Sequence, residues 1–208
     1  MLKFQPGTEF YYGNNNTILR ALIVERVTGK SFSEFIEERI FTPLQMTGSF
    51  TKQDFISENR KIALGAMPLA LTGITAYTTA VDLFKLETAL WSDNFLQSDF
   101  ISKAIKKPSL GGDSRAYYDF GFYKSDANGA LQSIEHDGTY PSHYALKHTN
   151  LQKDYTIVLL SNDGRKTTLN EIRKAIVDYL ENGKLELPYT WKVKTKIKKM
   201  GWQGRSNS

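Results

Sequence analysis

The chain has 208 residues, a net charge of +5 and no cysteine. That length suffices for one substantial domain or for two small ones that share a core. The absence of cysteine excludes disulfides, thiolate zinc sites and a cysteine nucleophile. No apolar run is long enough for a transmembrane helix, and residues 1–5 lack the apolar core of a signal peptide, so the sequence predicts neither a membrane span nor export.

The net positive charge is concentrated at the C-terminal end. From Lys184 onward there are seven lysines and arginines against one glutamate, a net +6, so the preceding residues sum to −1. We therefore expect a near-neutral domain over residues 1–183 and a basic tail over 184–208. The favoured interpretation of the tail is a solvated or frayed end, and an anionic envelope surface is the alternative partner. No nucleic-acid partner is expected, because no nucleic-acid-binding fold accompanies the tail.

The first half of the chain predicts helices. Apolar residues recur at helical spacing over 17–29, where Gly29 suits a left-handed stop. Ser31 and Glu34 have the spacing of a capping box that opens a second helix, and Pro43 prevents it from continuing. Residues 47–72 show no sustained periodicity and predict a long irregular segment.

A third helix is predicted from Thr79, with Asp82 at the position of a capping partner. The sequence then changes to short runs separated by turn signals, including a tight turn at 128–129. The predicted strands span residues 118–123, 131–136, 142–149 and 155–161. The stretch "TIVLL" is so apolar that its strand is expected to be central and covered on both faces. A last helix is predicted over 169–180, so the fold class is α+β, with a helical part followed by an antiparallel sheet and a C-terminal helix.

Two short constellations carry candidate chemistry: Tyr12-Gly13-Asn14 before the first helix, and His136-Asp137-Gly138-Thr139 at a strand end. Taken alone, the first is explained as an asparagine-rich N-cap. The second is explained as a strand-ending turn. The three histidines of the chain lack the spacing of metal ligands, so neither a metal nor a cofactor is expected.

The order and surroundings of both constellations resemble one known family. "PGTEFYYGNNNTILRALIVERVTGKSFSEFIEERIFTPLQM" is similar to the segment of serine β-lactamase-related proteins that carries their Tyr-x-Asn motif. "TGITAYTTAVDLFKLETAL", "FGFY", "IEHDGTYPSHYALKHT" and "DYTIVLLSND" resemble later landmarks of that family, in the family's order. The resemblance covers residues 5–179 and implies an incomplete β-lactamase/transpeptidase-like fold that works by acyl transfer from a serine.

The resemblance also implies roles for individual residues. Tyr12 would be the proton shuttle beside the nucleophile, and Asn14 would hydrogen-bond the acyl-side amide of the substrate. His136 and Gly138 would line the strand edge of the cleft. The backbone N–H of Thr139 would form half of the oxyanion hole.

The nucleophile motif of the family, Ser-x-x-Lys, precedes Tyr-x-Asn by a long stretch. Here eleven residues precede Tyr12 and none is serine. The one literal match, Ser49 to Lys52, follows Tyr-x-Asn and is interpreted as a coincidence, because its neighbours disfavour the helix that would align the two side chains. A free phenol has a pKa near 10, so without a neighbouring cation only about one in a thousand is ionised at pH 7.

We therefore expect the C-terminal part of a β-lactamase-related serine hydrolase or penicillin-binding protein, inactive alone. Its parent substrates would be small molecules or peptidoglycan-like peptides. The alternative is a non-catalytic binding module, or half of a split enzyme whose partner chain supplies the N-terminal segment. An exposed strand edge and an unfilled apolar groove are expected in either case. Family members commonly act outside the cytoplasm, but the sequence leaves the compartment open.

Overall fold

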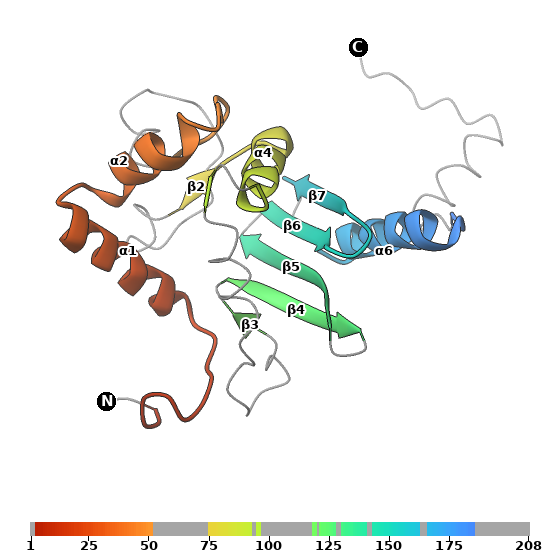
Figure 1. Ribbon diagram of the computed structural model, residues 1–208, viewed down its shortest axis with the longest axis horizontal. Helices are drawn as coiled ribbons and strands as arrows, with labels where there is room; N and C mark the ends of the chain where they lie inside the picture. The colour runs from red at the N-terminus through yellow and green to blue at the C-terminus, as the bar shows by residue number, and fades with distance from the viewer. Residues whose placement is uncertain are drawn as a thin grey trace, which may run out of the picture. The chain divides into compact units, whose positions relative to one another are not determined.

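The computed structural model describes residues 3–51, 75–92, 95–96, 118–119, 121–127, 130–140, 143–162 and 166–185. Figure 1 shows the chain as a ribbon. The chain divides into two compact units, and each is described by itself. The first unit comprises Met1–Asp137 and Leu146–Leu160. The second comprises Gly138–Ala145 and Ser161–Ser208.

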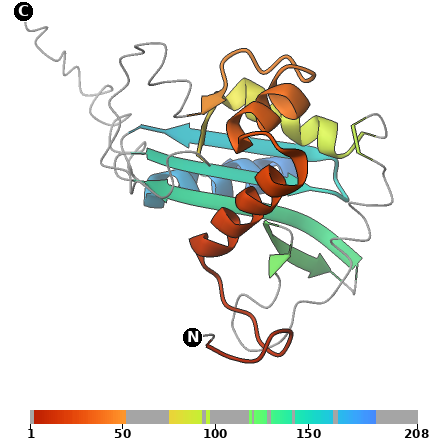
Figure 2. The same ribbon diagram turned by 90° about the vertical axis from the view of Figure 1, so that its left-hand side faces the viewer.

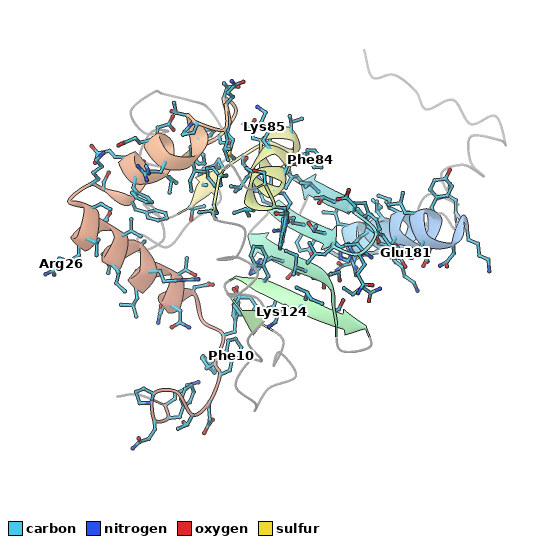
Figure 3. All side chains as sticks on the ribbon, viewed as in Figure 1. Phe10, Arg26, Phe84, Lys85, Lys124 and Glu181 are labelled. Atoms are coloured by element: carbon cyan, nitrogen blue, oxygen red, sulfur yellow. The ribbon has the colours of Figure 1, made fainter. Side chains whose placement is uncertain are left out.

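Helix α1 spans Asn14–Thr28 and confirms the first predicted helix. It ends as expected at Gly29, which has a φ of 68° and whose N–H donates to the Glu25 carbonyl. A residue with a side chain would be strained at that φ, so glycine is the natural stop. The apolar residues of α1 are nevertheless largely exposed: Leu19, Leu22, Ile23 and Val27. Arg26 also points outward from this helix in Figure 3.

Helix α2 spans Phe32–Ile36 and begins with the predicted capping box, in which Ser31 and Glu34 bond each other's backbone N–H groups. It runs on into the π-helical turn η1, Glu37–Phe41, and the helical stretch ends before Pro43. The buried residues of the helical core are Ile36, Phe41 and Met46. Partly buried apolar side chains pack against them: Phe32, Phe35, Ile40, Leu44 and Leu86.

Helix α4 spans Ala80–Leu90, and the Thr79 hydroxyl caps it by accepting from the N–H of Asp82. The buried Asp82 carboxylate accepts from the Gly48 N–H at 2.8 Å and from the Ser49 hydroxyl at 3.0 Å. Burial alone would raise the pKa of Asp82, but bonds from Lys85, Gly48 and Ser49 outweigh it and hold the pKa below its ordinary value. Asp82 therefore ties α4 to the loop that follows the helical core.

The strands form two antiparallel sheets. β1, Phe50–Thr51, pairs with β2, Ala76–Tyr77. The larger sheet has the order β3-β4-β5-β6-β7, and its middle strands are visible side by side in Figure 2. Its strands are β3 Tyr118–Asp119, β4 Phe122–Ala127, β5 Ala130–Tyr140, β6 His143–Asn150 and β7 Tyr155–Ser161.

Two contacts define how β6 lies against β5. The Leu151 N–H donates to the Gln132 carbonyl at 2.8 Å. The imidazole Nδ1 of His148 is 3.2 Å from the Glu135 carboxylate. Both contacts fit one antiparallel register, with the residue pairs directly opposite each other.

The predicted central position of the "TIVLL" strand is wrong. β7 is the last strand in the order of the described sheet, and Leu160 is 37% exposed, although Ile157 is buried. An apolar run reports how much surface a strand tends to bury, but it does not determine which strands pair with it.

The second unit contains α6, Lys166–Asn182, which confirms the predicted last helix. Its buried side chains include Leu169 and Ala175.

Three of the sequence predictions lie outside the described residues: the irregular segment from 52 onward, the turn at 128–129 and the basic tail from 186 onward. Among the helices that are described, none has the length and apolar character needed to cross a membrane. Helices followed by antiparallel strands and a final helix confirm the α+β class.

Changing Asp82 to Asn should destabilise the chain. The amide removes the charge on which three donors converge and places an N–H₂ group among them, so we expect a loss of about 1.5–3 kcal/mol in the free energy of unfolding. Denaturant unfolding followed by circular dichroism measures it. The control is Glu38→Gln, the same chemical change in an exposed ion pair with Lys30, which should cost little. Equal stability of the two variants would contradict this role for Asp82.

Candidate active site

Tyr12 lies in the extended segment just before α1. Gly13 occupies the N-cap position, and no side chain caps the helix there. Asn14 is the first helical residue and is exposed, and the Asn16 amide reaches back to the Tyr11 carbonyl at 3.4 Å. The structure therefore does not support the interpretation of Tyr12-Gly13-Asn14 as an asparagine N-cap.

Four rings pack together in the first unit and form what we call the tyrosine cluster: Tyr12, Tyr118, Tyr123 and His136. Tyr12 meets Tyr118 edge-on, with ring centroids 5.3 Å apart. Tyr118 and Tyr123 lie 5.9 Å and 5.7 Å from the imidazole of His136. The structure thus brings together Tyr12 and His136, which are 124 positions apart in the sequence.

The segment before α1 contributes one more ring to this region. Phe10, labelled in Figure 3, has its ring centroid 5.7 Å from that of Tyr118. Tyr12 also stacks over Tyr123, at 6.5 Å. The N-terminal segment is therefore fixed to the sheet by aromatic packing at Phe10 and at Tyr12, the first residue of the Tyr-x-Asn motif.

Sequence reasoning missed Tyr118 and Tyr123 as site residues. The run 118–123 was expected to be one strand, in which residues five apart face opposite sides. Instead the chain turns at Gly121, with a φ of 94°, and the two tyrosines become direct partners across β3 and β4. The glycine within an aromatic run was the available signal for this turn.

The tyrosine cluster favours neutral groups. Burial, with a further contribution from Tyr12, raises the pKa of Tyr118, although Arg20 opposes this. Burial lowers the pKa of His136 below its ordinary value, and Lys147 acts in the same direction, while Asp137 opposes both. The Tyr118 hydroxyl lies 3.4 Å from Nε2 of His136. When the neutral imidazole carries its proton on Nδ1, Nε2 accepts and the phenol O–H donates to it.

Gly138 and Thr139 continue β5 beyond His136, and both are exposed. They belong to the second unit, so their predicted roles in the cleft stay predictions.

Among the described residues, no group of three or more histidine or acidic side chains is placed to hold a metal ion.

Ser49 is not on a helix. It precedes β1, and its hydroxyl bonds the Thr78 hydroxyl at 2.7 Å and the Asp82 carboxylate at 3.0 Å. Lys52 lies outside the described residues, but the strand at Phe50–Thr51 already rules out the helical face that Ser-x-x-Lys requires. The extended backbone at these residues agrees with the interpretation of this match as a coincidence.

Comparison with known proteins finds matches among β-lactamase-related and penicillin-binding proteins. The family model described as Beta-lactamase matches residues 1–181. Penicillin-binding protein 4* of Bacillus subtilis is 24% identical over 211 aligned positions, which cover 89% of this chain and 46% of that protein. The chain thus spans about half the length of the curated relatives it matches.

Solved structures show the same fold. A penicillin-binding protein from Bacillus halodurans superposes with a TM-score of 0.67 at 23% identity, covering 84% of this chain and 58% of that one. A D-amino acid amidase from Ochrobactrum anthropi, solved with D-phenylalanine, gives a TM-score of 0.65 at 18% identity, covering 87% and 61%.

If Ser49 is structural, Ser49→Ala should lower stability without removing a reactive serine. We expect a loss of about 1 kcal/mol, because one bond to the buried Asp82 is lost. A fluorophosphonate probe should label neither wild type nor variant at this position. Thr47→Ala, an exposed change in the same loop, is the stability control. Labelling of the wild type that disappears in Ser49→Ala would contradict this assignment.

Proposed function

Because this chain belongs to the β-lactamase family, we propose that it is the C-terminal part of a serine hydrolase or penicillin-binding protein. The parent reaction is acyl transfer from a lactam, a D-amino-acid peptide or an ester carbonyl to water or another acceptor. The observation that carries the proposal is the tyrosine cluster, in which Tyr12 and His136 both contact Tyr118.

In this proposal Tyr12 moves the proton of the nucleophile, and Asn14 holds the acyl-side amide of the substrate. Their placement supports these roles: the Tyr12 ring is held by Tyr118 and Tyr123, and Asn14 is exposed in the first turn of α1. His136 and Gly138 line the edge of β5, and the N–H of Thr139 stabilises the oxyanion.

The chain alone is proposed to be inactive. The sequence contains one Ser-x-x-Lys match, and the structure uses its serine to hold the Asp82 carboxylate. In this proposal the serine that Tyr12 deprotonates belongs to further polypeptide, either continuous with this chain or separate from it.

A second candidate function is a binding module, or one half of a split enzyme. It is favoured by the exposed apolar side of α1, where Leu22, Ile23 and Val27 are 52%, 61% and 79% exposed. Apolar residues at these spacings lie on one side of a helix and usually contact another polypeptide.

Acylation by a fluorescent penicillin tests the proposal. The chain alone should form no covalent adduct. When a polypeptide containing the family's Ser-x-x-Lys segment is co-expressed with it or fused to it, an adduct should form on that serine. Tyr12→Phe should then slow acylation about 10²–10⁴-fold, because the proton shuttle is lost.

The matched control is Tyr11→Phe, which removes the hydroxyl of the neighbouring tyrosine, 53% exposed, and should leave the rate unchanged. Acylation of the chain alone, or equal rates for Tyr12→Phe and wild type in the completed protein, would count against the proposed roles.

A further inference from the structure

Lys147 is a buried cation in the first unit. Its side chain is 9% exposed, and its ammonium forms an ion pair with Glu87 of α4, whose side chain is 2% exposed. Glu87 also accepts from the Trp91 indole at 3.0 Å and from the Thr149 hydroxyl at 2.7 Å. Both oxygens of the buried Glu87 carboxylate are therefore hydrogen-bonded, which favours keeping this charge buried beside the ammonium.

The contacts between β5 and β6 place this cation near His136 of the tyrosine cluster. The Glu135–His148 contact and the Leu151–Gln132 hydrogen bond fit a register in which His136 and Lys147 pair across β5 and β6. Residues paired in this way share a face, and their Cβ atoms lie about 5 Å apart. The ammonium of Lys147 also lies 4.0 Å from the centre of the Phe122 ring in β4.

We propose that Lys147, held by Glu87, is a positioning residue that keeps the His136 imidazole neutral and its Nε2 turned as an acceptor toward the Tyr118 hydroxyl. The place of His136 in an active site rests on the proposed function. The electrostatic relation between the two side chains does not.

The two protonation states of His136 place different charges and donors beside its neighbours. A protonated imidazole donates from both nitrogens, so its hydrogen bond with Tyr118 would reverse, with the phenol oxygen accepting from Nε2. It would also place a second positive charge directly across the strands from a buried ammonium. The geometry therefore disfavours protonation of His136 through repulsion from the Lys147 ammonium.

The other charged and titratable groups near His136, Tyr118 and Lys147 come from five helices and strands and from the segment before α1. They are Asp137 and Glu135 on β5, Tyr118 on β3, Tyr123 on β4, Glu87 on α4, Tyr12 before α1, and Arg20 on α1. Burial is the largest influence on the pKa of His136 and lowers it. Asp137 raises that pKa and Lys147 lowers it, so the net direction is downward. Arg20 is a second cation on the Tyr118 side.

A histidine with a lowered folded-state pKa has a defined effect on stability. The unfolded chain takes up the proton first, so the contribution of neutral His136 is fully present above the ordinary value of 6.5. It is lost as the pH falls below that value.

The test is a pH titration of the full chain by long-range ¹H–¹⁵N NMR, which reports both the charge and the tautomer of each imidazole without substrate. In the wild type the midpoint of His136 should fall below 6.5, with the proton of the neutral ring on Nδ1. In the double variant Glu87→Gln, Lys147→Gln, the two amides can bond each other while both charges are gone. We expect its His136 midpoint to shift upward.

The matched control is Lys30→Gln, Glu38→Gln, the same double change in an exposed ion pair, which should leave the His136 midpoint unchanged. An unchanged midpoint in the Glu87 and Lys147 double variant would overturn the role of Lys147. If that variant does not fold, the wild-type spectra still test the proposal. A His136 midpoint above 6.5, or a neutral His136 with its proton on Nε2, overturns it. None of these results depends on acylation, so the failure of this inference and that of the proposed function are separable.

Discussion

The buried ion pair between Glu87 and Lys147 is the constraint on which the first unit depends, because it fixes helix α4 to strand β6. The same helix reaches the helical core through Leu86 and holds the loop before β1 through Asp82. Removing one partner of a buried pair typically costs about 3–5 kcal/mol, more than a surface ion pair contributes. α4 therefore connects the helical part of the unit, the small sheet and the larger sheet.

Features with local causes could be predicted from the sequence. The capping box at Ser31, the helix stop at Gly29 and the start of α4 at Thr79 each depend on residues within one helical turn, and each is confirmed. The position of β7 and the turn at Gly121 were predicted wrongly. Both depend on which strands pair, a choice made by contacts distant in sequence.

In the candidate site, too, some residues could be predicted from local sequence and others could not. Tyr12 and His136 were identified from short motifs, and the structure places them against shared neighbours. Lys147 carried no such signal, since a lysine within a strand is usually at the surface. Its burial becomes understandable only when Glu87, sixty positions earlier, is seen to meet its ammonium. The burial of these two charges depends on how the fold brings α4 and β6 together. It therefore cannot be predicted from the sequence of either segment alone.

Family membership, the shared fold and the tyrosine cluster support the proposal that this chain forms one wall of an acyl-transfer site. The central claim is that a Ser-x-x-Lys segment completes it. The most direct measurement is the sequence of the genomic DNA upstream of the Met1 codon. The account predicts a reading frame that encodes Ser-x-x-Lys, in frame or behind a single frameshift or stop. The absence of such a frame there, together with no co-purifying chain that carries the motif, would contradict it.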